Sequence, residues 1–110
     1  MDLTFKQYSN KAQEFAIYNR DLGVYYLILG LCGETGEVAD KLKKIYRDKG
    51  GVITEEDKKS IAYELGDVLW YLSNIANELG ISIEDIAKLN LAKLYKRKEN
   101  GTIQGNGDNR

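Results

Sequence analysis

The sequence contains no histidine and no proline, and Cys32 is its one cysteine. The lack of histidine excludes acid or base catalysis by an imidazole, and it excludes zinc sites with histidine ligands. A single cysteine cannot form a disulfide within the chain, so nothing in the sequence requires an oxidising compartment. We therefore expect a cytoplasmic protein whose metal chemistry, if it has any, uses oxygen ligands.

Long apolar runs and an excess of one charge are also missing. The longest strongly apolar stretch, residues 24–32, is far shorter than the roughly 20 residues of a membrane-spanning helix. An acidic residue, Asp2, stands where a signal peptide would carry basic side chains. The 16 basic and 17 acidic side chains give a net charge of −1, which argues against general binding to nucleic acids. We expect neither a membrane nor a nucleic-acid partner.

Helical periodicity is the main pattern that the sequence does contain. Without proline, and with glycine placed mainly near likely ends and turns, the 110 residues read as one all-α domain. Cap signals at Thr4, Thr54 and Ser82, with the stop Gly50-Gly51, separate four helices. The expected helices cover residues 4–19, 21–48, 54–79 and 82–99. Residues 1–99 would form a four-helix, bundle-like domain, and the Gly- and Asn-rich residues 100–110 a flexible C-terminal tail.

Aromatic content suggests self-association. A chain of this length buries a modest core, and eight tyrosines leave more aromatic surface than a monomer needs to expose. We expect a homodimer or a homotetramer.

Two pairs of acidic residues occupy unexpected positions on the helical wheels. Glu34 falls within an apolar stripe of the second helix, and Glu37 lies one turn later at the margin of that stripe. Glu64 and Asp67 repeat the arrangement on the third helix. Solvated charges paired with Lys41 or other lysines are the simpler explanation for such residues.

Position nevertheless favours a metal site. Converging carboxylates that are buried without neutralisation are costly, and a bound cation removes that cost. Carboxylate ligands select hard cations such as Mg²⁺, with Mn²⁺ possible, and these ions also bind substrate phosphates. The substrate would then be a phosphate ester or anhydride.

Several neighbouring residues are candidates for substrate binding. Lys41 follows Glu37 by one turn, and Lys93 and Arg97 share a flank of the last helix, so all three could hold phosphate charge. Asn90 falls within the apolar stripe of that helix, where a core hydrogen bond and a ligand contact are both open.

Glycines inside the predicted helices, such as Gly30, Gly33 and Gly36, lie near the acidic residues. They indicate close helix packing or close approach of a ligand.

The segments Gly33-Glu34-Thr35-Gly36-Glu37 and Glu64-Leu65-Gly66-Asp67 resemble the MazG-like nucleotide pyrophosphohydrolases, whose pattern is E-E-x-x-E followed by E-x-x-D. Gly33 replaces the first glutamate of that pattern. The resemblance implies that Glu34, Glu37, Glu64 and Asp67 are the magnesium ligands and catalytic residues. It also implies that Asn90 and Lys93 approach the phosphates. Tyr71, one turn after Asp67, would contact the sugar or base, or would pack inside the bundle.

The activity implied by this resemblance is hydrolysis of a nucleoside triphosphate to the monophosphate and pyrophosphate, by attack of a metal-associated water on the α-phosphorus. One alternative is a related pyrophosphohydrolase for phosphoribosyl-ATP or a dedicated pyrimidine triphosphate. The other is a non-catalytic helical oligomer that binds metal or nucleotide.

Overall fold

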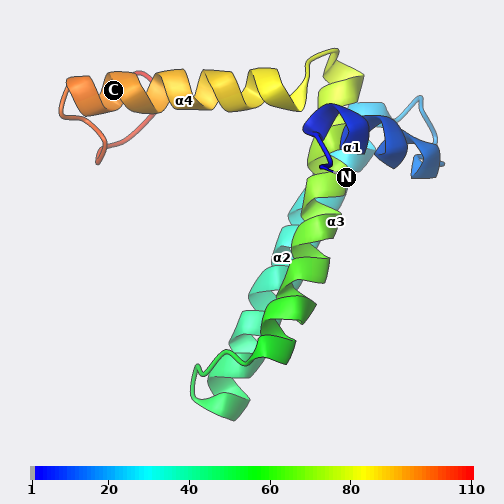
Figure 1. Ribbon diagram of the computed structural model, residues 1–110, viewed down its shortest axis with the longest axis vertical. Coiled ribbons are helices and arrows are strands. Elements are labelled where there is room, and N and C mark those ends of the chain that lie inside the picture. The colour runs from blue at the N-terminus through cyan, green and yellow to red at the C-terminus, as the bar shows by residue number, and fades with distance from the viewer. Residues whose placement is uncertain (1) are drawn as a thin grey trace.

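The computed structural model describes residues 2–110 and shows an all-α chain with four α-helices (Figure 1). No strand occurs within residues 2–110. The expected all-α class is therefore confirmed. The elements are α1 (Phe5–Ala12), the short 3-10 helix η1 (Gln13–Phe15), α2 (Gly23–Lys49), α3 (Glu55–Leu79) and α4 (Ile83–Glu99).

Local sequence fixes most helix ends. Thr4 and Thr54 each accept a hydrogen bond from the backbone N–H three residues later, and both form complete capping boxes. Ser82 caps α4 in the same way by accepting from the N–H of Asp85. Gly50 and Gly80 end α2 and α3 with positive φ angles of 62° and 71°, which glycine adopts without steric cost.

The first helix is shorter than expected. The prediction of a helix as far as residue 19 is wrong, because Ala16 leaves the helical region at φ −86° and ψ 78°. After it, Ile17 is 93% exposed, and the Tyr18 hydroxyl donates a 2.8 Å hydrogen bond to Glu78 near the end of α3. This long-range anchor holds the 16–22 segment in an irregular path, and α2 begins at Gly23.

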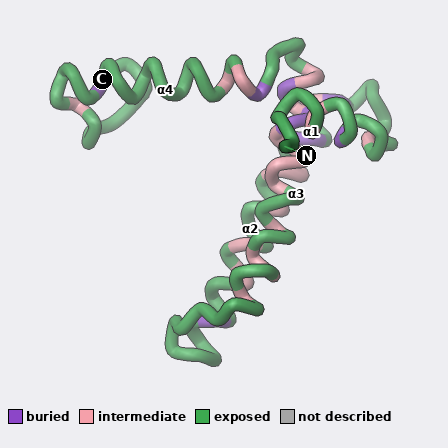
Figure 2. The backbone as a smooth tube through the Cα atoms, in the orientation of Figure 1, coloured by how far each residue is buried: buried purple, intermediate pink, exposed green. Residues whose placement is uncertain are grey.

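The long helices α2 and α3 form an antiparallel hairpin, and α1 packs against the end of α3 (Figure 1). The Trp70 indole donates a 3.1 Å hydrogen bond to the carbonyl of Ala12, which ties α1 to the hairpin. Buried residues gather where α1 meets the hairpin (Figure 2), and they include Ala12, Leu27 and Ala76. Any site between α2 and α3 is therefore built on this hairpin.

The expected four-helix bundle is not what the structure shows, because of the direction of α4. It packs mainly against α1 near its own start and then runs away from the hairpin, so the four helices do not close into a bundle (Figure 1). Within α4 only Ile83 and Arg97 are buried. Residues 101–110 turn back onto α4, where Asp108 pairs with Lys93 at 3.3 Å and with Arg97 at 3.2 Å. The flexibility expected for residues 100–110 stays a prediction.

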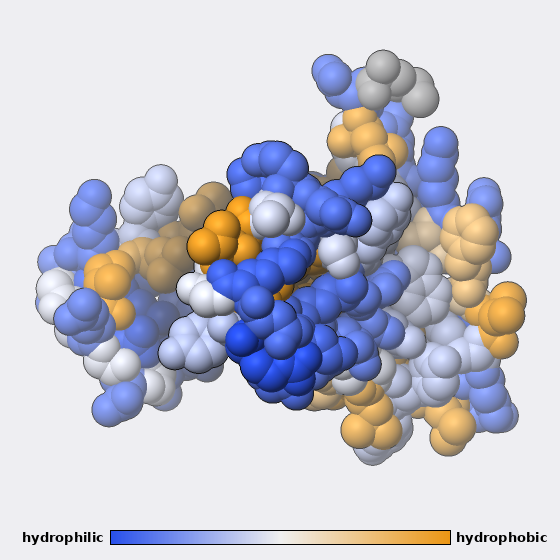
Figure 3. All heavy atoms as spheres, turned by 90° about the horizontal axis from the view of Figure 1, so that it is seen from below, coloured by the Kyte–Doolittle hydropathy of each residue, from blue (hydrophilic) through white to orange (hydrophobic). Residues whose placement is uncertain are grey.

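Apolar side chains reach the surface in several places (Figure 3). Tyr25 is 80% exposed and Leu29 is 74% exposed on α2, and Leu89 and Tyr95 are exposed on α4. Of the helices described for this chain, none is long and apolar enough to cross a membrane. The apolar surface is therefore spread over the outside of a hairpin and a projecting helix.

Candidate metal centre

Three carboxylates meet between the two helices of the hairpin. Glu34 from α2 and Glu64 and Asp67 from α3 each offer one carboxylate oxygen, and these oxygens lie within 4.8 Å of one another. Glu34 and Glu64 are half-buried, and Asp67 is exposed. Glu64 and Asp67 are one turn apart on the same face of α3, so antiparallel packing of α2 brings Glu34 opposite both.

The electrostatics of this acidic cluster (Glu34, Glu64 and Asp67) favour a cation. Burial raises the pKa of Glu34, and the negative charges of Asp67, Glu64 and Glu37 raise it further. A divalent ion with oxygen ligands would remove this repulsion, and the all-carboxylate donor set suits Mg²⁺ or Mn²⁺. The residues present therefore fit the metal that the sequence predicts.

Glu37 stands apart from the other three predicted ligands. It is exposed on α2 and is not among the carboxylates that converge. Its charge still reaches the site, because it contributes to the raised pKa of Glu34.

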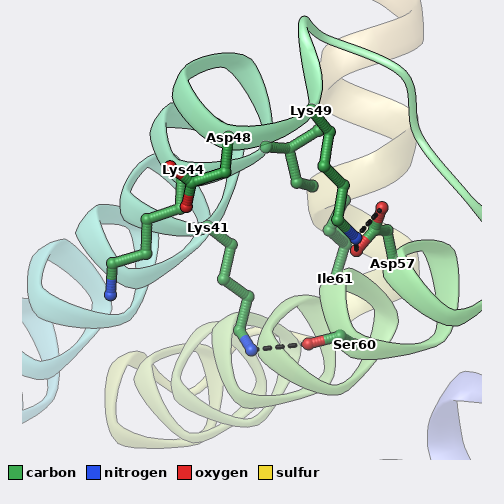
Figure 4. Close-up of a pocket in the computed structure, with 8 residues that line it drawn as sticks. Lys41, Lys44, Asp48, Lys49, Asp57, Ser60 and Ile61 are labelled. Carbon is green, nitrogen blue, oxygen red and sulfur yellow. Dashed lines mark hydrogen bonds and ion pairs between the residues drawn. The ribbon is translucent and has the colours of Figure 1, made fainter.

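Lys41 on α2 points toward Ser60 on α3 (Figure 4), and its ion pair with Glu64 places it beside the acidic cluster. Its ammonium donates a 2.6 Å hydrogen bond to the Ser60 hydroxyl and lies 3.6 Å from Glu64 Oε1. Both lysine and serine line a cavity of about 190 Å³ between the helices. Ser60 was not among the residues that the sequence singled out.

Tyr71 packs tightly at the other side of the site. Its ring lies against the backbone of Gly30 on α2 and meets Trp70 edge-on, with ring centroids 5.0 Å apart. Burial raises the pKa of Tyr71, and Tyr26, Glu34 and Asp67 add to the shift. Tyr71 thus packs between the helices, and it lies close enough to the acidic cluster for Glu34 and Asp67 to affect its pKa.

Other tyrosines close to this side were not singled out from sequence. Tyr26 stacks on Tyr18 with centroids 5.3 Å apart. Tyr8 on α1 has a raised pKa, caused by burial and then by Asp67. Their sequence signal is weak, because tyrosine at helical spacing looks the same in a core.

The candidate residues on α4 are not brought to the acidic cluster within one chain. Asn90 is exposed, which corrects its expected place on a buried stripe, because no other element of residues 2–110 covers that face of α4. Lys93 and Arg97 pair with Asp108. The structure thus groups Glu34, Glu64, Asp67, Lys41 and Tyr71, and leaves Asn90, Lys93 and Arg97 elsewhere.

Comparison with known proteins identifies a family and two relatives of this chain. Residues 24–102 match the family described as the MazG nucleotide pyrophosphohydrolase domain. The chain is 51% identical over 88 residues to the Gene 37 protein of Mycobacterium phage L5, covering 80% of this chain and 77% of that protein. It is 44% identical over 55 residues to the uncharacterized protein YpjD of Bacillus subtilis (strain 168), covering 50% of this chain and 49% of that protein. No solved structure matches the chain.

The family match includes both acidic segments, all of α3 and all of α4. Its span begins one residue after the start of α2, so α1 lies outside it. Neither relative carries a name that states an activity. The chain belongs to the MazG nucleotide pyrophosphohydrolase domain family.

Proposed function

We propose that this protein is a Mg²⁺-dependent nucleoside triphosphate pyrophosphohydrolase, which converts a ribo- or deoxyribonucleoside triphosphate to the monophosphate and pyrophosphate. The observation that carries the proposal is the convergence of Glu34, Glu64 and Asp67 within 4.8 Å in a chain of this family. The neighbouring ammonium of Lys41 cannot by itself balance three carboxylates, so the cluster suits a hard cation, which in turn can bind a phosphate anhydride substrate.

In this mechanism the chain supplies positioning and charge. Glu34, Glu64 and Asp67 would hold the ion, which when bound polarises the phosphate and the attacking water. Glu34 or Glu37 would accept a proton from the attacking water. Lys41 lies beside Glu64, where its positive charge can stabilise the leaving pyrophosphate. Glu37 would add negative charge at the edge of the site.

Association into a homodimer or homotetramer is part of the proposal. The chain exposes 8435 Å². A compact monomer of 12.5 kDa should expose about 6,200 Å². The difference of about 2,200 Å² is more than one partner contributes to a standard interface, roughly 800 Å². A phosphate-binding role for Asn90, Lys93 and Arg97 therefore requires a second copy to bring α4 to the acidic cluster.

A cytoplasmic location fits the same picture. Cys32 is exposed and free, which suits a compartment where thiols stay reduced. The proposed substrates, nucleoside triphosphates, are present in the cytoplasm, so the proposed activity and the proposed location agree.

The test is turnover of the eight common ribo- and deoxyribonucleoside triphosphates, with Mg²⁺ or with EDTA, followed by separation of the products. Glu64→Gln is the decisive variant, and Glu56→Gln is the matched control on the same helix. We expect monophosphate and pyrophosphate from wild type and control, and neither product with EDTA or in Glu64→Gln. Asn90→Ala and Lys93→Ala should raise KM if α4 of a second copy completes the site.

Release of diphosphate and orthophosphate would overturn the proposed reaction, since a different bond would then be cleaved. Absence of turnover with all eight nucleotides would point to a specialised substrate such as phosphoribosyl-ATP, or to a non-catalytic binder. Sedimentation at the mass of one chain would overturn the proposed association.

A further inference from the structure

The ammonium group of Lys41 lies beside the acidic cluster. Lys41 and Glu64 form an ion pair across the hairpin, with the lysine side chain 33% exposed and the glutamate side chain 21% exposed. The separation of 3.6 Å is longer than that of a charge-assisted hydrogen bond, which is about 2.7–2.9 Å. The shorter contact of the same ammonium is the 2.6 Å bond to Ser60. Ser60 therefore holds the ammonium to one side of Glu64.

This arrangement makes two cations competitors for one carboxylate. A divalent ion held by Glu34, Glu64 and Asp67 would sit within a few ångströms of the Lys41 ammonium, and like charges at that range repel where water is partly excluded. The ammonium also neutralises part of the charge that attracts the ion. Lys41 should therefore weaken metal binding, and Ser60 should limit how much it does so.

We propose that Lys41 is a built-in counter-ion of the acidic cluster, which competes with the divalent metal for Glu64, and that Ser60 is a positioning residue that keeps this competition partial. The proposal rests on the proposed function only in taking the metal to be the one that the hydrolase would use. It assigns to Ser60 a role that acts through Lys41.

Neighbouring lysines do not share this geometry. Lys43 and Lys44 both pair with Asp40 on their own helix at 2.9 Å, and Lys49 pairs with Asp57 at 2.9 Å. In Figure 4 Lys41 points toward Ser60 on α3, whereas Lys44 points its ammonium away from it. Lys43 thus offers a matched control, because its removal changes the net charge equally without touching the acidic cluster.

The experiment measures Mn²⁺ binding to the full chain, without nucleotide, by titration calorimetry or electron paramagnetic resonance. The variants are Lys41→Met, Lys41→Gln, Lys41→Arg, Ser60→Ala, the double variant Lys41→Met with Ser60→Ala, and Lys43→Met. Lys41→Gln keeps a polar side chain in case the methionine disturbs packing, and circular dichroism checks that each variant is folded.

Loss of the ammonium should lower the Mn²⁺ dissociation constant by at least about tenfold in Lys41→Met and Lys41→Gln, which is the change expected for a unit charge about 6 Å from a divalent ion even at the dielectric constant of bulk water, about 80. Lys41→Arg should stay close to wild type, and Lys43→Met should change the constant by less than about twofold, because solvent screens exposed charges. Ser60→Ala should raise the constant severalfold, since the freed ammonium can close on Glu64. In the Lys41→Met background, Ser60→Ala should have no effect.

Unchanged or weaker Mn²⁺ binding in both charge-loss variants would overturn the proposal, and so would a Ser60→Ala effect that persists without Lys41. Equal shifts of the Mn²⁺ dissociation constant in Lys41→Met and Lys43→Met would show that the effect comes from net charge alone. That result would overturn the counter-ion role but not the proposed hydrolase activity. Mn²⁺ binding with the predicted pattern but no turnover would overturn the hydrolase and keep the counter-ion. No Mn²⁺ binding by any variant would overturn both.

Discussion

Gly30 gives the sharpest test of how α2 and α3 fit together. A Cβ atom on Gly30 would lie 2.5 Å from Tyr71 Cζ and 2.8 Å from Tyr71 Cδ1, with Cε1 closer still. Carbon atoms pack best at about 3.5–4.0 Å, so one methyl group cannot be placed there without moving the ring. Trp70 meets the Tyr71 ring edge-on and restricts that movement.

Two effects of opposite sign determine the result of Gly30→Ala. Alanine in a helix interior is about 1 kcal/mol more favourable than glycine. Overpacking a fitted contact costs about 1–3 kcal/mol, and the short distances here favour the upper end. We expect a net destabilisation of about 2 kcal/mol. In a Tyr71→Ala background the clash is gone, so Gly30→Ala should instead stabilise by about 1 kcal/mol.

The assay is urea unfolding followed by circular dichroism, at one protein concentration, for wild type, both single variants and the double variant. Gly33→Ala and Gly36→Ala are the controls on the same helix, because a Cβ at either position would meet no heavy atom of residues 2–110 within 4 Å apart from its chain neighbours and the nearby backbone of its own helix. Both controls should stabilise by about 1 kcal/mol. If Gly30→Ala stabilises wild type as much as the controls do, the close packing of Tyr71 on α2 is refuted.

Three further predictions concern the metal and pH. Addition of Mg²⁺ should raise the Tm of wild type in differential scanning fluorimetry but not that of Glu64→Gln, because a ligand stabilises only the state that binds it. Since burial and neighbouring acids raise the folded-state pKa of Glu34 above 4.5, its ionisation should lower stability as pH rises. In EDTA, the free energy of unfolding of Glu34→Gln relative to that of wild type should therefore increase between about pH 4 and pH 7, as measured by urea unfolding. Equal pH profiles of the two proteins would contradict this. The Thr54 N–H and then the Lys49 ammonium lower the pKa of Asp57 from 3.8 to about 2, so its stabilisation is complete above 3.8 and is lost as pH falls toward 2. Asp57→Asn should flatten acid unfolding in that range, and an unchanged slope would exclude this assignment.

Helix identity and most helix ends could be predicted from sequence because local residues determine them. Thr54 with Asp57, Ser82 with Asp85, and Gly80 act within a few residues of their own position. The end of α1 could not be predicted in this way. Its continuation competes with the Tyr18 bond to Glu78, a partner sixty residues away in the chain.

The site was predictable where a residue broke the periodicity of its own helix. Glu34 did so, and it lies with Glu64 and Asp67 as the wheel positions indicated. Residues whose placement depends on the direction of a whole helix were not predictable. Asn90 illustrates this, because its face of α4 is exposed once α4 leaves the hairpin. Ser60 was missed because an isolated serine on a helix surface carries no signal until Lys41 is placed opposite it.

The projecting path of α4 has a consequence for how the chain folds. The hairpin joins α2 and α3, neighbours in sequence, through the short connection of residues 50–54, and local contacts of this kind form quickly, in microseconds to milliseconds. Helix α4 has little of its own chain to pack on, so under the proposed association its apolar residues would gain burial when another copy arrives. Refolding should therefore show a fast phase independent of protein concentration, from the hairpin, followed by a slower phase whose rate rises with concentration as α4 becomes buried.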